Sequence, residues 1–190
     1  MTFKVFGYGS LVNRGTLPPY VHAERCTVKG WRRAWRKRSP GLGVTGACSL
    51  SVVEAPGAEI DGLVVTFEDG LMPTITAREH NYDLLRLKDD PDIIIFRAKA
   101  EVDDYGDDDH PILLSYVDAT VQGFLREFGD DGAERFMATT DGWHVPIVND
   151  RADPRYARAQ QLGSAEEKRI NQLLQSVDAT PVRAQEKRSV

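Results

Sequence analysis

The sequence predicts a protein of the α+β class, in which a strand-rich first half is followed by helices that cover it. Three observations favour this class. Short segments rich in β-branched and aromatic residues, separated by Gly and Pro clusters, fill the first half. After Pro111, apolar residues recur at three- and four-residue steps, as in amphipathic helices. No repeat or linker divides the 190 residues, so we expect a single domain over residues 1–177.

The predicted strands are short and bounded by turn-forming residues. They lie at 3–8, 26–28, 33–37, 48–53, 62–67, 82–87 and 93–102. Combinations of Pro and Gly predict turns at 40–43 and 55–57.

Three helical segments are expected. A short helix follows Gly70, because Pro73 suits a first helical turn and Ile75 and Glu79 could share one face. The longest helix begins after Pro111 and stops at Gly129, with a shorter one from about Gly132 to Ala138. The pattern Ser-Ala-Glu-Glu at 164–167 predicts a capping box at the start of the last helix. Beyond it, residues 178–190 are polar and aperiodic, and we expect a disordered tail.

Composition narrows the classes of partner and compartment. A net charge of −5 and a pI near 5.4 argue against a general nucleic-acid binder. No apolar run approaches the roughly 18 residues that a membrane helix needs, and the start lacks the architecture of a signal peptide. Cys26 and Cys48 stand outside any CxxC pattern. We therefore expect a cytoplasmic protein with no membrane or nucleic-acid partner.

A glycine-containing turn follows the first predicted strand. Residues 6–11 read Phe-Gly-Tyr-Gly-Ser-Leu, and the glycines permit backbone angles that direct amide N–H groups at a bound oxygen. The segment lacks the trailing Lys-Ser/Thr of a P-loop and the third glycine of a dinucleotide fingerprint. From pattern alone, it could also be an ordinary strand-ending turn.

Glu79 is the carboxylate that could carry chemistry. It lies near the apolar face of the short helix, where that helix gives way to a strand. Such a carboxylate is a surface group, the ion-pair partner of Arg78 or another cation, or a working acid/base group. His80, beside it, could tune such a site, and Tyr116 and Trp143 are core residues that could also face it.

A basic run stands between the first strand and the 40–43 turn. It comprises Lys29, Arg32, Arg33, Arg36, Lys37 and Arg38, interleaved with Trp31 and Trp35. The run could line an anionic site, but we favour an alternating strand with a solvated face.

The acidic segment 103–110 invites a metal-site interpretation but lacks EF-hand spacing, and the histidines form no ligand pair. We therefore interpret it as a solvated loop and expect no metal. Asp150 and Arg151 could form a salt bridge or contact substrate, and we favour the salt bridge.

Several motifs together resemble those of the gamma-glutamylcyclotransferase family, in particular its ChaC-type branch. Residues 6–12, Phe-Gly-Tyr-Gly-Ser-Leu-Val, resemble the family's substrate loop, and 28–35 is similar to its Gly-aromatic-Arg-Arg stretch. Residues 62–65 resemble its strand beginning with glycine, and Arg-Glu followed by Tyr-Asp at 78–83 resembles the segment with the catalytic glutamate. These elements occur in the family's order over roughly residues 3–87.

The resemblance implies a small mixed β-barrel flanked by helices. It also implies that Glu79 is the general acid/base and that Tyr8, Gly9, Ser10 and Leu11 hold a γ-glutamyl group. The implied enzyme releases 5-oxoproline and a free amine from glutathione or another γ-glutamyl peptide, without a cofactor. Its partner would be a small-molecule γ-glutamyl substrate, and a homodimer is left open.

Two alternatives stay open. One is a γ-glutamyl-amine cyclotransferase, or another amide-cleaving variant, on the same fold. The other is a non-catalytic binding protein, against which the presence of both the glycine loop and Glu79 speaks. The second half of the chain carries none of the matched motifs, and we expect it to shape the pocket for the leaving group.

Overall fold

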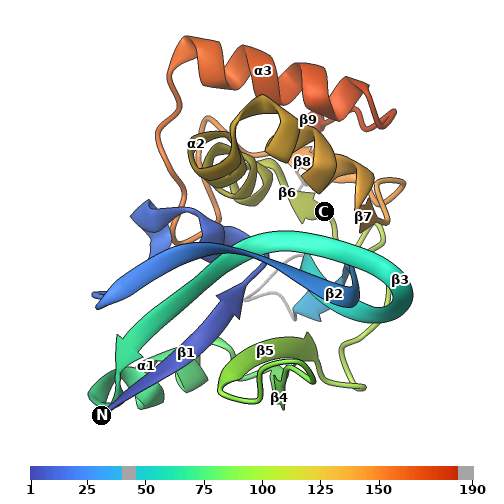
Figure 1. Cartoon of the computed structure of the whole chain (residues 1–190). Helices are drawn as coiled ribbons and strands as arrows, with labels where there is room; N and C mark the ends of the chain where they lie inside the picture. Colours follow the sequence, from blue (N-terminus) through green and yellow to red (C-terminus); the bar gives the residue numbers. More distant parts are fainter. Residues whose placement is uncertain (40–45, 184–190) are drawn as a thin grey trace.

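A mixed sheet flanked by helices forms the protein, as Figure 1 shows for a computed structural model that describes residues 1–39 and 46–183. The strands are β1 (Thr2–Gly7), β2 (His22–Ser39), β3 (Ala47–Glu68), β4 (Tyr82–Arg86), β5 (Ile93–Ala98), β6 (Ile112–Leu113), β7 (Thr140–Asp141), β8 (Ile147–Asn149) and β9 (Val182–Arg183). The helices are η1 (Ser10–Val12), η2 (Arg14–Thr16), η3 (Asp69–Leu71), α1 (Met72–Arg78), α2 (Leu114–Ala138) and α3 (Ser164–Gln175). The α+β prediction is confirmed.

Strand β3 is the centre of the sheet. It pairs antiparallel with β1 and with β2, and parallel with β6. From β1 the path continues to β5 and β4, and from β6 it continues to β8 and β9, while β7 pairs with β2. In Figure 1, α2 and α3 lie together on one side of the curved strands β2 and β3, and α1, β4 and β5 lie on the other. The sequence predicted a small mixed β-barrel flanked by helices. The structure has a mixed sheet flanked by helices, and its described strands follow an open path from β4 to β9.

Each of the two long strands contains two segments that were predicted as separate strands. The segments predicted at 26–28 and 33–37 both lie in β2, and those at 48–53 and 62–67 both lie in β3. The turn predicted at 55–57 is wrong, because β3 continues through it. Gly57 has φ +85° and Gly30, in β2, has φ +83°, so these glycines absorb a register shift as an irregularity within the ladder. The turn predicted at 40–43 lies outside the described residues.

Packing in the core holds together the elements that surround the cavity described below. Strand β5 carries the buried run Ile93 to Phe96, typical of a strand covered on both faces. Helix α2 buries Val117, Val121 and Phe124 completely. It also receives the chain that follows β1, since Asn13 Nδ2 donates to Ala119 O at 2.7 Å. The N-terminal part of α2 is thereby held to the chain that follows β1.

The predicted helices are present, with local differences at their ends. Gly129 (φ +71°) interrupts α2 where a stop was expected, and helical structure resumes up to Ala138. The capping box expected at 164–167 is shifted by one residue, because Gly163 N donates to Glu166 Oε2 at 2.9 Å. Val182–Arg183 forms β9 within the segment expected to be a tail, and 184–190 lie outside the described residues. In the part of the chain that is described, no helix has the length and apolarity to cross a bilayer.

Candidate active site

The turn after β1 is shaped by two glycines. A Cβ on Gly7 would lie 2.5 Å from Leu11 Cβ, and a Cβ on Gly9 would lie 3.0 Å from Tyr116 Oη. A side chain at Gly7 would clash with Leu11, and one at Gly9 would press against the Tyr116 hydroxyl. The absence of side chains here permits the tight turn into η1, with Gly9 as its N-cap. Because the first N–H groups of a helix have no acceptor within it, those of Ser10 and Leu11 make no hydrogen bond inside η1.

Arg33 of β2 holds this turn from behind. Its side chain is fully buried, and Nε donates to Tyr8 O at 2.7 Å. The other guanidinium nitrogens donate to Thr139 Oγ1 at 2.7 Å and to Asp61 O, and the ring of Phe124 lies 4.9 Å from Cζ. These contacts offset the cost of burying the charge. The favoured interpretation of the basic run, a solvated face, is therefore wrong for Arg33.

Glu79 caps the C-terminal end of α1. Its N–H donates to Ile75 O at 3.0 Å, and its side chain is only 13% exposed. Arg78 Nε lies 3.2 Å from Glu79 Oε1. The same guanidinium donates to Thr16 O at 2.9 Å and to Ser10 Oγ at 3.3 Å, which ties the end of α1 to the glycine turn.

The environment of Glu79 favours its protonated form. Burial raises the pKa of the carboxyl, and the positive charges of Arg78, Arg158 and Lys37 offset part of the rise. A carboxylate with a raised pKa is a stronger base than an ordinary glutamate, which is the property required of a general acid/base.

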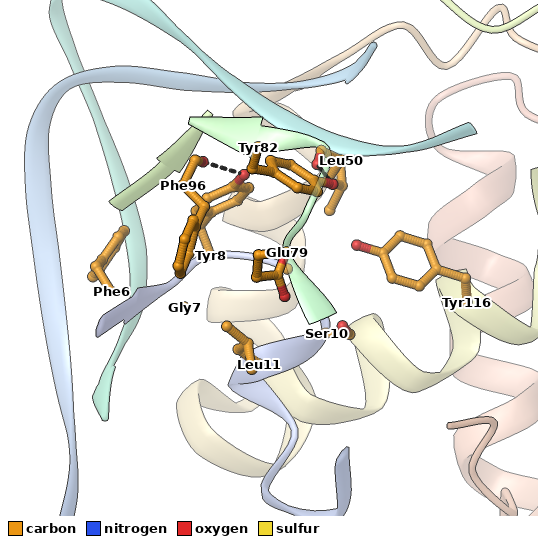
Figure 2. A pocket seen from close by; sticks show the side chains of 11 residues that line it. Phe6, Gly7, Tyr8, Ser10, Leu11, Leu50, Glu79, Tyr82, Phe96 and Tyr116 are labelled. Carbon is orange, nitrogen blue, oxygen red and sulfur yellow. Dashed lines mark hydrogen bonds between the residues drawn. The ribbon is translucent and has the colours of Figure 1, made fainter. Parts of the chain in front are cut away.

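The residues expected to form the site converge on one cavity. Tyr8, Gly9, Ser10, Leu11 and Glu79 all line a cavity of about 40 Å³ (Figure 2). The rest of its lining comes from Phe6, Gly7, Leu50, Tyr82, Phe96 and Tyr116. Residues 6–11 and Glu79 are distant in sequence, and the sheet brings them together.

Three tyrosines surround this cavity and remain protonated, because burial raises the pKa of each. Tyr8 Oη donates to Phe96 O at 2.6 Å, and Tyr82 Oη donates to Leu50 O at 2.8 Å. Tyr116 points into the cavity from the first turn of α2 (Figure 2). From the sequence, Tyr116 was a core residue that could also face the site. The motif that contains Tyr82 gave no indication that the Tyr82 side chain would line the cavity.

Other candidates lie elsewhere. His80 is exposed and its Nδ1 lies 3.2 Å from Ala77 O, so it does not line the cavity. The salt bridge expected between Asp150 and Arg151 is wrong, because Arg151 pairs with Asp118 at 2.7 Å and Asp150 accepts hydrogen bonds from other groups. Trp143 packs in the core against α2.

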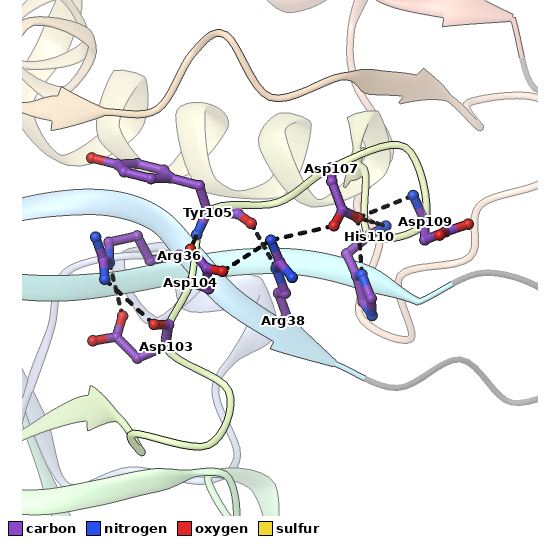
Figure 3. A network of polar contacts seen from close by, with 8 residues as sticks. All are labelled: Arg36, Arg38, Asp103, Asp104, Tyr105, Asp107, Asp109 and His110. Atoms are coloured by element: carbon purple, nitrogen blue, oxygen red, sulfur yellow. Dashed lines mark hydrogen bonds and ion pairs between the residues drawn. The ribbon is translucent and has the colours of Figure 1, made fainter.

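The acidic segment 103–110 is tied to β2. Arg36 pairs with Asp103, and Arg38 lies between Asp104 and Asp107 at 3.2 and 3.3 Å (Figure 3). The solvated-loop interpretation is incomplete, since these carboxylates hold the strand edge. Within residues 1–39 and 46–183, no group of three or more His, Cys, Asp and Glu side chains is placed to hold a metal ion.

Solved structures with this arrangement of elements include a gamma-glutamyl cyclotransferase. The two chains align with a TM-score of 0.54 and 12% identity, over 90% of this chain and 99% of that one. An uncharacterized protein from Homo sapiens aligns with a TM-score of 0.52 and 13% identity, over 90% and 98%. YkqA from Bacillus subtilis aligns with a TM-score of 0.51 and 14% identity, over 74% of this chain and 56% of that one.

No family model and no curated protein matches the sequence. The structural likeness extends over nearly the full length of the first two solved chains. This chain therefore has the fold of a gamma-glutamyl cyclotransferase.

Proposed function

We propose that this protein is a gamma-glutamylcyclotransferase that converts a γ-glutamyl amide to 5-oxoproline and a free amine. The observation that carries the proposal is the convergence of the turn at residues 8–11 and the buried Glu79 on one cavity. The fold supports the proposal, as does the resemblance of the motifs that supply these residues.

The reaction joins two atoms of one substrate. The α-amino nitrogen attacks the γ-carbonyl carbon, a new C–N bond closes the five-membered ring, and the original amide C–N bond breaks. Because the attack is intramolecular, the enzyme mainly has to hold the glutamyl chain in a folded shape. Phe6, Leu11 and Tyr8, which line the cavity, would contact the folded chain.

Glu79 would move the proton. An ordinary glutamate and an α-amino group differ by about 3.7 in pKa, which makes proton transfer uphill by about 5 kcal/mol. Burial raises the pKa of Glu79 and narrows this gap. The carboxyl would then return the proton to the departing nitrogen, so that an amine leaves rather than an amide anion.

The turn would stabilise the carbonyl oxygen as it becomes negative. The N–H groups of Ser10 and Leu11 at the start of η1, and the protonated Tyr116 hydroxyl, would be the donors to this oxygen. Donors fixed before the reaction stabilise a developing oxyanion without reorganisation. Arg33 contributes indirectly, because it holds the Tyr8 carbonyl on the far side of the turn.

A substrate panel tests the proposal. Glutathione, γ-glutamyl dipeptides and γ-glutamyl amines are incubated with the purified protein, and 5-oxoproline is measured by mass spectrometry. Release from glutathione above the others would support the ChaC-type branch, and release from γ-glutamyl amines alone would support the amine-specific alternative. Binding of a γ-glutamyl compound by the folded protein without any 5-oxoproline would contradict the proposal and favour a binding protein.

A further inference from the structure

A second, larger cavity of about 230 Å³ adjoins the first. The two share Ser10, Glu79, Tyr82 and Tyr116, so Glu79 lies at their boundary. Basic side chains line the second cavity: Lys37, Arg78, Arg155 and Arg158. Among the described residues, Glu79 is its one acidic lining residue. We call this cavity the basic pocket, and its charge contrasts with the net −5 of the chain.

Lys37 is directed into the basic pocket by the strand that carries it. Successive side chains of a strand point to opposite faces, and Arg36 and Arg38, on either side of Lys37, pair with the acidic segment (Figure 3). The backbone is held there as well, since Asp104 N donates to Arg36 O at 2.8 Å. The acidic segment therefore fixes the orientation of Lys37.

The Lys37 ammonium is buried without a carboxylate partner. The residue is 8% exposed, Nζ donates to Ser39 Oγ, and it lies 5.4 Å from the centroid of the Tyr82 ring. Across the described part of the chain, no carboxylate lies within 4.0 Å of Nζ. Glu79, in the same pocket, attracts the Lys37 charge without pairing with it directly, and burying a charge with no directly paired counter-ion is costly. An anionic group bound in the pocket would supply the missing charge.

Arg158 reaches the same pocket from the segment after β8. That segment is fixed because Asp150 Oδ2 accepts from the N–H of Arg155 at 2.9 Å. Arg158 Cζ lies 5.3 Å from the centroid of the Tyr156 ring, and Nε donates to Tyr156 Oη at 3.3 Å. A guanidinium held against a ring is suited to recognising a carboxylate.

We propose that the basic pocket binds a carboxylate carried by the leaving amine, so that the substrate is a γ-glutamyl amino acid or peptide and not a γ-glutamyl amine. The inference rests on the proposed function, which places bond cleavage at Glu79. With the γ-glutamyl group in the smaller cavity, the departing amine extends into the basic pocket. A cationic amine there would meet Lys37 and Arg158, whereas a carboxylate would neutralise them.

A matched pair of substrates tests this assignment. γ-Glutamylalanine and γ-glutamylethylamide differ by the carboxylate of the leaving group, and both keep the α-carboxylate of the glutamyl group. Each is assayed with the wild type, Lys37→Met and Arg158→Gln. Lys88→Met is the control, because Lys88 is 87% exposed and lies outside both cavities. Circular dichroism checks folding, and the partly exposed Arg158 keeps the test available if Lys37→Met does not fold.

We expect each pocket variant to lose about 10- to 100-fold in kcat/KM for γ-glutamylalanine, mainly through KM, because a charged hydrogen bond made in both ground and transition states is removed. With γ-glutamylethylamide we expect a clearly smaller loss, because Lys37 and Arg158 also lower the pKa of Glu79 and that effect is common to both substrates. All rates of Lys88→Met should be unchanged. Equal losses for both substrates would mean that Lys37 and Arg158 act on the glutamyl group or on Glu79 and not on a leaving-group carboxylate, and would overturn the inference alone. Two results together would contradict the proposed function, and this inference with it. They are that the wild type turns over neither substrate and that Glu79→Gln binds neither in calorimetry.

Discussion

The surroundings of Glu79 disfavour the ionised form of its carboxyl group. Its carboxylate is largely buried, and the cations Arg78, Arg158 and Lys37 only partly offset the desolvation that raises its pKa. A charged group kept in such a place lowers the stability of the folded state. Active sites commonly tolerate such a cost because the same environment provides reactivity.

This balance predicts that Glu79→Gln stabilises the protein at neutral pH. In the unfolded chain the carboxyl ionises at its ordinary pKa, and in the folded chain it ionises at a higher pH. Between these values the folded state binds more protons, so stability falls as pH rises, and the loss persists above the folded pKa. The glutamine variant has no such loss, so its melting temperature should exceed that of the wild type at pH 7.

Thermal unfolding followed by circular dichroism at pH 7 and near pH 4 measures this difference. The advantage of Glu79→Gln should shrink towards the acidic pH, where the wild-type carboxyl is mostly protonated in both states. A variant less stable than the wild type at pH 7 would show that attraction to Arg78 outweighs desolvation.

At the scale of elements, the turn from β1 into η1 depends on the absence of side chains at Gly7 and Gly9. Gly7→Ala would bring its Cβ to 2.5 Å from Leu11 Cβ and 3.2 Å from the Leu11 carbonyl carbon. Because the backbone must move, we expect a loss of about 1–3 kcal/mol in the free energy of unfolding. Gly9→Ala meets the Tyr116 hydroxyl at 3.0 Å, so it should cost less stability but displace a donor from the cavity.

Urea unfolding and turnover assays separate these effects. Gly70→Ala is the control, because a Cβ there meets nothing within 4 Å and should change stability by less than about 0.5 kcal/mol. Full activity in Gly9→Ala would argue that Tyr116 has no role in the reaction.

The buried Arg33 connects β2 to the same turn. Arg33→Leu leaves Tyr8 O and Asp61 O without their donor, and we expect it to destabilise the protein by at least about 2 kcal/mol. Arg32→Leu is a matched control in the adjacent position. Its ion pair with Asp141 is partly exposed and should be worth less than about 1 kcal/mol. Equal effects in denaturant unfolding would contradict the role given to Arg33.

At the scale of the whole molecule, the cavity draws on both halves of the chain. The turn and Glu79 come from the first half, and Tyr116 comes from α2, which also binds the chain after β1 through Asn13. We therefore expect the chain to unfold as a single unit. Far-ultraviolet circular dichroism and the fluorescence of the tryptophans, which include Trp35 and Trp143, should give coincident denaturant transitions. Two separate transitions would show that the halves fold independently.

Local patterns predicted most of the elements, because periodicity and turn residues act over a few neighbours. The continuity of β3 across residues 55–57 was missed, since whether a Pro-Gly pair ends a strand or forms an irregularity depends on its partner, β2. The loop and Glu79 were found through motifs. Burial of Arg33 was missed because its acceptors, among them Tyr8 O, are distant in sequence.

The basic pocket was only partly anticipated. An anionic site was one interpretation of the basic run, but a strand pattern does not reveal which of its charges point inward. Lys37 is directed inward by the acidic segment that holds its neighbours, and Arg158 reaches it from a loop more than a hundred residues further along the chain. Long-range contacts of this kind determine which charged groups line the pocket, and no local sequence pattern indicates them.

The most direct test of the account is the rate of 5-oxoproline release by Glu79→Gln on the best γ-glutamyl substrate. Glutamine keeps the shape of the side chain but cannot accept the proton, so we expect kcat to fall by about 10²–10⁴-fold. Glu134→Gln, at a 60% exposed side chain paired with Arg169, should retain the wild-type rate. A folded Glu79→Gln protein that releases 5-oxoproline at the wild-type rate would contradict the assignment of Glu79 as the general acid/base.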